Sequence, residues 1–403
     1  MVRIAVTVGR PSRANRARER RRVNWGVSNH DMLMPRSLSG RSVILLAAYA
    51  LAGCARPHAV TQTGAAVSSA DRSLLPGPMP ADAPPRFRML LGEYDAPLGM
   101  RVVFEDNGRM WLADTTHVGG KLQHAAMLTE VAEYQFGIEP TDARLILGPT
   151  RPGLLIFEHG AGVRPLAMVH GGVRMPRRDI EPEPGTTQLR VTPVRPVEQV
   201  RVEALAASPP AERGPFRTAD LVELTKLDPT IKLEIRYATT NNFLGTRFYD
   251  EARAFMQRRA AEALVRAHQA LRPLGYGLLI HDAYRPWYVT KMFWDATPDD
   301  KRWLVANPAQ GSRHNRGAAV DLTLYELATG KPVEMPSTYD ESTDRAYADY
   351  PGGTSRERWF RKLLRNAMEA QGYAVNPTEW WHFDYAEWRF YPIGNIAFDK
   401  IGT

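Results

Sequence analysis

Between residues 86 and 175, apolar and polar positions alternate in short runs that are separated by turn residues. Residues 101–106 and 109–114 form the clearest pair, joined by Asn107-Gly108, the dipeptide typical of a type I′ hairpin turn. Further runs lie at 154–158, at 163–169 and from 173 onward, and residues 122–136 fit either a short helix or another strand. The alternation predicts a small antiparallel β domain, a barrel or a sandwich, over 86–175.

From residue 218 onward the pattern changes to a mixture of strand and helix periods. The predicted elements are strands at 231–237, 277–281 and within 373–385, and helices at 250–271, 287–295 and 356–371. Pro273 with Gly275 closes the first helix, and Gly372 closes the last one. The fold class predicted for 218–403 is therefore α+β, with a central, mostly antiparallel sheet and helices packed on it.

Two segments lack such periodicity. Residues 54–85 are rich in Ala, Ser, Pro and Gly, which is typical of a flexible tether, so order is expected from about Arg86. Residues 176–217 are rich in proline and carry one strand-like piece, 199–205, which predicts an interdomain linker. The β domain between these two segments resembles the small lipocalin-like barrel appended to some bacterial serine hydrolases.

The N-terminus has the pattern of a targeting segment. Residues 43–51 are apolar, follow Arg36 and Arg41, and are too few to span a bilayer, which suits the core of a signal peptide. The run ends in Leu51-Ala52-Gly53-Cys54, which resembles the lipobox of bacterial lipoproteins, and Cys54 is the only cysteine in the chain. The resemblance implies cleavage of 1–53, lipidation of Cys54 and a membrane-anchored protein of the bacterial envelope, facing the periplasm or the exterior. Residues 1–31 are interpreted as an over-extended start before Met32 or Met34.

Charge excludes one class of partner. The chain has a formal net charge of +8, but ten arginines and only two acidic residues fall within residues 1–53. The remaining 350 residues carry 42 basic and 42 acidic side chains. No nucleic-acid partner is therefore expected for the mature chain, because it lacks the basic excess that attracts a polyanion. An arginine-rich tail that binds nucleic acid is the weaker alternative for residues 1–31.

Two short motifs carry the candidate chemistry. His314 and Asp321 are seven positions apart, with a turn at Gly317 between them, and His382 follows Glu379 by three. Two imidazoles and one carboxylate can hold a zinc ion and leave a fourth position open, as in catalytic sites, whereas a structural zinc site typically uses four ligands, often thiolates. A single histidine is usually an ordinary core or surface residue, but the two motifs together favour a zinc peptidase with Glu379 as general base.

Glu379 and His382 would face opposite sides of a regular strand. The sequence therefore predicts that Glu379 lies at a bent entry to the strand, near Pro377. Arg285 ends a buried strand and could stabilise an oxyanion, although a surface ion pair with Asp282 is equally compatible with the spacing. His281 is predicted to be a core residue or to support a ligand.

Residues 220–392 resemble the D-alanyl-D-alanine dipeptidase family, which includes the vancomycin-resistance D,D-dipeptidases. The resemblance rests on Arg236-Tyr237-Ala238-Thr239 with Asn242-Phe243, Asp282-Ala283-Tyr284-Arg285-Pro286, Ser312-x-His314-x-Arg316-Gly317-x-Ala319-x-Asp321-Leu322-Thr323-Leu324-Tyr325, and Glu379-Trp380-Trp381-His382. The segment between Arg285 and Ser312 is shorter than in the resistance enzymes, and the anchor and β domain are additions. These departures bear on substrate range rather than on chemistry.

The resemblance implies one zinc ion on His314, Asp321 and His382, Glu379 as general base and acid, and Arg285 as transition-state stabiliser. It also implies that Asp340 holds the amino terminus of the substrate and that Tyr237 and Ser312 bind substrate. The expected substrate is a small D,D-dipeptide, D-alanyl-D-alanine, cleaved to two D-alanines. A zinc D,D-carboxypeptidase acting on longer wall peptides and a wall-binding lipoprotein with a purely structural zinc remain as alternatives.

Overall fold

The computed structural model describes residues 72–97, 99–115, 122–138, 154–161, 164–178 and 189–402, all within one compact unit, residues 64–403. The predicted signal segment, the predicted lipidation site Cys54 and most of the predicted tether lie outside the described residues. None of the described helices is both long and apolar enough to cross a membrane.

The N-terminal part of the described chain is an eight-stranded antiparallel sheet whose strands follow chain order. A helix, α2 (Pro85–Arg88), precedes the strands, which are β1 (Gly92–Ala96), β2 (Gly99–Asp106), β3 (Arg109–Thr115), β4 (Leu122–Ala132), β5 (Gln135–Ile138), β6 (Leu154–His159), β7 (Pro165–His170) and β8 (Val173–Pro176). A β-bridge between Tyr94 and Arg177 links the two ends of the sheet. The predicted β domain is confirmed as a nearly closed barrel, and 122–136 forms strands rather than a helix.

The predicted hairpin turn is confirmed by its backbone. Asn107 and Gly108 have φ of 50° and 78°, the positive values that a type I′ turn requires at both central residues. Inside the barrel, alternate residues of the strands form a separate apolar core, which includes Val103, Leu112, Phe136, Leu155, Phe157 and Met168. The alternation along each strand therefore determines which side chains fill the barrel.

The C-terminal part is built on a five-stranded sheet of order β10-β12-β13-β15-β14. Its strands are β10 (Lys232–Leu233), β12 (Tyr276–Asp282), β13 (Ala319–Glu326), β14 (Tyr373–Asn376) and β15 (Glu379–Tyr385). Only β10 and β12 pair in parallel, so the predicted mostly antiparallel sheet is confirmed. The strand predicted at 231–237 is much shorter, because Arg236–Ala238 turns into a 3₁₀ helix, η3.

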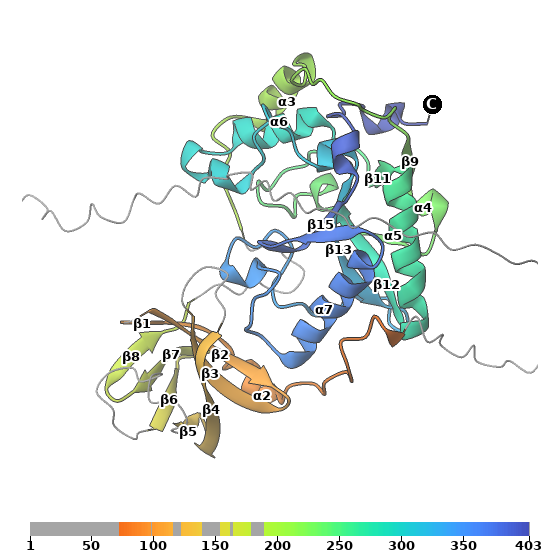
Figure 1. Ribbon diagram of the computed structural model, residues 1–403. Helices are drawn as coiled ribbons and strands as arrows, with labels where there is room; N and C mark the ends of the chain where they lie inside the picture. The colour runs from red at the N-terminus through yellow and green to blue at the C-terminus, as the bar shows by residue number, and fades with distance from the viewer. Residues whose placement is uncertain are drawn as a thin grey trace, which may run out of the picture. The chain divides into compact units, whose positions relative to one another are not determined.

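Helices cover the apolar face of this sheet. The first is α5 (Arg258–Leu271), which follows a short strand, β11 (Phe255–Gln257), paired with β9 (Leu221–Glu223). Figure 1 shows α5 running beside β12, and α7 (Ser355–Glu369) below β15 in that view. Leucines and alanines of both helices share one core with β12, β13 and β15, including Leu264, Leu363, Leu278, Leu322 and Phe383.

The segment predicted as a linker contains a helix where a strand was expected. Residues Val197–Ala206 form α3, with Val200 and Ala204 fully buried, and α3 packs on α6 (Trp287–Ala296). The prediction of a strand at 199–205 is wrong. Val200 and Ala204 are four positions apart, so in a helix they lie on one face and both can pack on α6. The remaining short helix, α4 (Leu224–Leu227), follows β9 directly.

The described end of the predicted tether also packs on the protein. Leu74 is buried in the core of the C-terminal part, and its carbonyl accepts a hydrogen bond of 2.8 Å from Asn366 of α7. The Trp359 indole donates to the Gly77 carbonyl at 3.1 Å. Order in the described chain therefore begins before Arg86, the position expected from composition.

Candidate metal centre and active site

Three side chains converge on the polar face of the five-stranded sheet. His314 comes from a 3₁₀ turn, η6 (His314–Arg316), and Asp321 and His382 come from β13 and β15. Gly317 ends the turn with φ of 64°, and a Cβ there would lie 2.7 Å from the Leu221 side chain, so the turn requires glycine. This turn brings His314 back towards the strand that carries Asp321.

The ligand atoms lie within hydrogen-bonding range of one another. His382 Nδ1 is 3.0 Å from Asp321 Oδ1 and 3.1 Å from His314 Nε2, and Asp321 Oδ1 is 3.4 Å from His314 Nε2. All three side chains are buried, and the described residues contain no other group of this kind that could hold a metal ion. The predicted ligand set is therefore brought together.

The opposite nitrogen of each imidazole is held by an oxygen. His314 Nδ1 lies 2.7 Å from the Ala283 carbonyl, and His382 Nε2 lies 3.0 Å from Asp384 Oδ1. These contacts require N–H at those nitrogens and leave the lone pairs of His314 Nε2 and His382 Nδ1 facing each other and Asp321, as metal-binding histidines need. The donor set fits one zinc ion with three protein ligands.

Asp384 was not identified from the sequence. It lies two residues after His382 on β15, so both side chains leave the same face of the strand, and that spacing was the signal available. Arg313 donates to Asp384 Oδ2 at 2.5 Å. Burial opposes ionisation of Asp384, but His382 and Arg313 outweigh it and lower its pKa.

Asp321 has a further partner that the sequence did not reveal. The Tyr339 hydroxyl donates to Asp321 Oδ2 at 3.0 Å, opposite the oxygen that faces the histidines. The Tyr339 ring in turn stacks on His281 with centroids 4.7 Å apart. His281 is buried, as predicted, and burial lowers its pKa to about 3, so the ring is neutral.

Glu379 reaches the metal group from a distorted strand entry. The pairing of β14 with β15 shifts between Val375 and Asn376, which places a bulge next to Glu379. Glu379 Oε2 lies 3.7 Å from His382 Nδ1 and accepts 2.9 Å from Asn376. Desolvation of the carboxylate and the nearby Asp321 charge raise its pKa. The predicted bend is thus present, and it turns the carboxylate towards the ligands.

Arg285 is buried and ion-paired. Its Nε and Nη2 donate to Asp282 Oδ2 at 2.9 and 2.7 Å, and Tyr249 donates to Asp282 Oδ1 at 2.7 Å. The guanidinium also lies over the rings of Tyr237 and Phe293. The backbone N–H of Arg285 donates to the His314 carbonyl at 3.1 Å. The pair with Asp282 exists, but inside the protein, and the same Asp282 Oδ2 lies 3.8 Å from His314 Nδ1.

Two of the predicted substrate-binding residues contact each other. The Tyr237 hydroxyl donates to Asp340 Oδ2 at 3.0 Å. Asp340 has φ of 60°, a left-handed conformation that Asp and Asn tolerate better than most residues. Burial, together with the charge of Asp321, raises the pKa of Asp340 to about 8. A positively charged partner would therefore relieve an unfavourable charge at this position.

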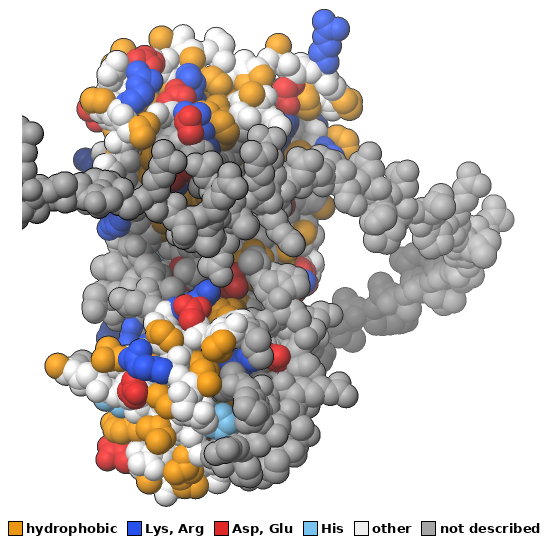
Figure 2. Space-filling model, turned by 90° about the vertical axis from the view of Figure 1, so that its left-hand side faces the viewer, with side chains coloured by type: hydrophobic (Ala, Val, Ile, Leu, Met, Phe, Trp, Pro, Cys, Tyr) orange, Lys and Arg blue, Asp and Glu red, His pale blue; other side chains and the backbone are white. Residues whose placement is uncertain are grey.

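Ser312 is used locally in the structure. Its hydroxyl accepts a hydrogen bond of 3.2 Å from the His314 amide, which shapes the turn that carries the ligand. A role of Ser312 in substrate binding remains a prediction. On the face drawn in Figure 2, basic and acidic side chains are intermingled, in line with the balanced charge of residues 54–403.

A buried His–Asp–His group with a carboxylate beside it, on a mostly antiparallel sheet, defines the class of the enzyme as a zinc metallopeptidase. Residues 217–392 match the peptidase M15 family of D-ala-D-ala dipeptidases. A D-alanyl-D-alanine dipeptidase of Escherichia coli K12 is 34% identical over 176 residues, which is 44% of this chain and 90% of the relative. Enzymes of the same name from Enterococcus faecium and Streptomyces coelicolor are 33% and 32% identical, each over 42% of this chain and 91% and 93% of the relative. The chain belongs to the D-alanyl-D-alanine dipeptidase family.

Proposed function

We propose that the enzyme hydrolyses D-alanyl-D-alanine to two molecules of D-alanine, with zinc held by His314, Asp321 and His382. The observation that carries the proposal is the convergence of these ligand atoms with the Glu379 carboxylate, 3.7 Å from His382 Nδ1. Zinc at this position supplies a Lewis acid that polarises a carbonyl and makes water a better nucleophile. The protein side chains supply the proton transfers, the charge stabilisation and the selection of substrate.

Glu379 acts as general base and then as general acid. Its carboxylate takes the proton from the attacking water and delivers it to the nitrogen of the leaving D-alanine. A raised pKa suits both steps, because a carboxylate with a pKa nearer neutrality accepts and returns a proton more readily. The hydrogen bond from Asn376 holds the carboxylate in this position.

Arg285 stabilises the negative oxygen that develops on the scissile carbonyl. Among the described residues its hydrogen bonds run from Nε and Nη2 to Asp282, which leaves Nη1 for a substrate oxygen. The guanidinium is pre-positioned by its ion pair and by the two rings beside it, so little reorganisation is needed during the reaction.

Asp340 selects substrates with a free amino group. Tyr237 orients its carboxylate, and the ammonium of a dipeptide supplies the positive partner that this charge lacks. A longer wall peptide presents a neutral amide there, so the charge-assisted hydrogen bond between the ammonium and Asp340 is lost. This argument favours a dipeptidase over a D,D-carboxypeptidase, which remains the second candidate.

The experiment that tests this function compares three substrates on zinc-loaded protein. Free D-alanyl-D-alanine should be hydrolysed, and N-acetyl-D-alanyl-D-alanine and a wall pentapeptide should be cleaved at least about a hundredfold less efficiently, a difference of about 3 kcal/mol. Equal cleavage of the free and blocked dipeptides would favour the carboxypeptidase.

We also propose that the mature enzyme is a lipoprotein of the bacterial envelope, cleaved before Cys54 and acylated there. The support is the apolar run 43–51 followed by Leu51-Ala52-Gly53-Cys54. A single acyl chain binds membranes only marginally, so stable attachment needs more than one. Cys54→Ser should abolish acylation and membrane partitioning, and unmodified Cys54 in membrane-bound protein would contradict the proposal. The resemblance of the barrel to a lipocalin-like domain stays a separate prediction.

A further inference from the structure

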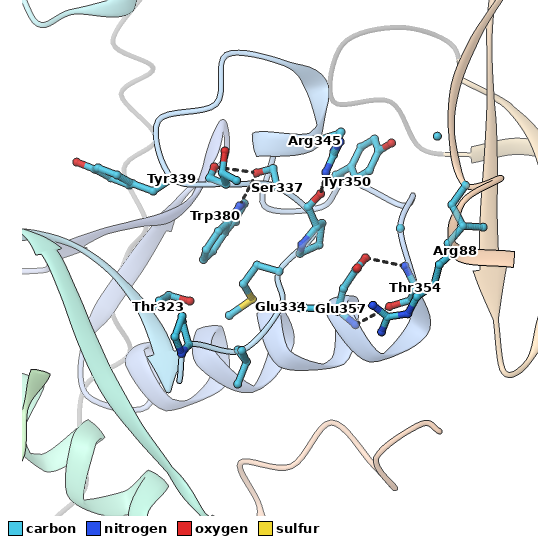
Figure 3. A pocket seen from close by; sticks show the side chains of 18 of the residues that line it. Arg88, Thr323, Glu334, Ser337, Tyr339, Arg345, Tyr350, Thr354, Glu357 and Trp380 are labelled. Atoms are coloured by element: carbon cyan, nitrogen blue, oxygen red, sulfur yellow. Dashed lines mark hydrogen bonds and ion pairs between the residues drawn. The ribbon is translucent and has the colours of Figure 1, made fainter. Parts of the chain in front are cut away.

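A second cavity lies on the polar face of the same sheet, beyond Tyr339. Its volume is about 490 Å³, within the range of ligand pockets. Figure 3 shows Tyr339, Ser337 and Trp380 on one side of it and Arg88, Thr354 and Glu357 on the other. None of the three predicted zinc ligands lines this pocket, so it is distinct from the metal centre.

The pocket wall contains polar atoms without partners. Thr323 Oγ1, Thr338 Oγ1 and His281 Nδ1 are buried and make no hydrogen bond to any residue that the structure describes. Thr323 and His281 are each only 4% exposed, and all three residues line the pocket. An unpaired buried polar atom costs free energy, so two such hydroxyls and one ring nitrogen around one cavity indicate a place where a polar molecule binds.

The nearby charged groups define the kind of molecule. Four arginines and three glutamates line the pocket, so its charge is slightly positive. Arg236 is buried and pairs with Glu234 at 3.0 Å, and the other oxygen of Glu234 lies 3.6 Å from His281 Nδ1. Guanidinium and hydroxyl donors suit a carboxylate. Trp380, Met335 and Val333 provide apolar surface for small side chains. The volume exceeds that of one amino acid, which favours a short peptide.

Tyr339 separates the two sites and contacts both. Its ring lines the pocket and stacks on His281, and its hydroxyl donates to Asp321 on the other side. We propose that this pocket is a second binding site, for a short peptide that ends in a free carboxylate, and that Tyr339 couples its occupancy to the metal centre. Tyr339 is a positioning residue in this scheme, because it acts through Asp321.

Binding is tested with N-acetyl-D-alanyl-D-alanine as the probe. The choice of a D,D-peptide rests on the proposed function. The measurement itself needs no turnover, because binding to the zinc-loaded Glu379→Gln protein is measured by calorimetry or by NMR titration. Arg236→Gln should weaken binding by about tenfold and Thr323→Val by about threefold, since each removes one donor. Thr329→Val, an exposed threonine that does not line this pocket, is the matched control and should leave the affinity unchanged.

Thr323→Val also separates a binding role from a structural one. Its hydroxyl has no partner among the described residues, so valine should keep the zinc content and the unfolding temperature. The proposal would be overturned if both pocket variants bound the peptide with unchanged affinity, or if His382→Ala were the one variant that lost binding. It would also be overturned if no binding were seen at about 10 mM peptide.

Coupling is measured through zinc affinity. The peptide should shift the zinc dissociation constant of the Glu379→Gln chain, and zinc should shift the affinity for the peptide by the same factor, because linkage is reciprocal. Tyr339→Phe, which removes only the hydroxyl, should abolish this shift while peptide still binds. An equal shift in Tyr339→Phe would refute the role of Tyr339. A failure of the proposed function is recognised separately, as absent hydrolysis of free dipeptide by the unmodified protein.

Discussion

Asp321 and His382 are directly paired positions on the antiparallel strands β13 and β15, and their ligand atoms lie 3.0 Å apart. Paired residues of neighbouring strands leave the same face of a sheet, so the backbone hydrogen bonds of the two strands hold the carboxylate against the imidazole. His314 then needs only the short turn at Gly317 to complete the group. The centre is thus held by the most regular part of the fold.

The first prediction is the metal content. Purified protein should bind about one zinc ion per chain, and His382→Ala should lose both zinc and activity, because two remaining ligands hold zinc weakly. Metal analysis with activity measurement tests this. The control is His159→Ala in the barrel, which should retain zinc. Full zinc content in His382→Ala would rule out the ligand assignment.

The second prediction concerns Asp384. Asp384→Asn removes the charge that faces His382 Nε2 while keeping the size of the side chain. Loss of such a partner typically lowers metal affinity by about 10- to 100-fold. A competitive chelator titration measures the change. Wild-type affinity in this variant would show that Asp384 does not support the ligand.

The third prediction concerns Glu379. Glu379→Gln should keep the fold and the zinc but lose about 10²- to 10⁴-fold in kcat, because the amide cannot accept the proton of water. Glu387→Gln is a matched control beyond the end of β15, where the carboxylate pairs with Arg217 and Arg259. Near-normal turnover in Glu379→Gln would mean that another group is the base.

The fourth prediction concerns selectivity at Asp340. Asp340→Asn suits the test better than an alanine substitution, because asparagine tolerates the φ of 60° found there. The variant should lose efficiency on free D-alanyl-D-alanine and discriminate less against the N-acetylated dipeptide. The ratio of the two kcat/KM values measures this, and an unchanged ratio would exclude Asp340 as the anchor of the amino group.

The same variant gives a pH-dependent change in stability. Folding raises the pKa of Asp340 from 3.8 to about 8, so the unfolded chain loses this proton at lower pH than the folded chain. The contribution of Asp340 to the free energy of unfolding therefore falls as the pH rises from about 4 to 8. Asp340→Asn should be more stable than the parent at pH 8 and not at pH 4, measured by denaturant unfolding of zinc-free protein. A difference that does not depend on pH would contradict the raised pKa.

The ligand motifs and most elements could be predicted from the sequence because their signals are local. Residues 314–321 form one turn followed by one strand, and the hairpin at Asn107-Gly108 is determined by two residues. Tyr339 could not be found in this way, because its contact with Asp321 spans 18 positions and depends on how a loop folds over the sheet. The segment 199–205 was predicted wrongly because its apolar residues pack on α6, a contact that local propensity does not contain.

Because Asp321 and His382 are paired positions, zinc binding also depends on how β13 and β15 are aligned. A slip of β15 by one residue would turn His382 to the helix-covered side of the sheet and bring Trp381 to the polar side. A misaligned molecule would therefore lack the site, and zinc would bind only the correctly aligned one. Zinc present during refolding should consequently raise the yield of native enzyme by trapping one alignment among several, even though no ligand lies in the helices that bury the core.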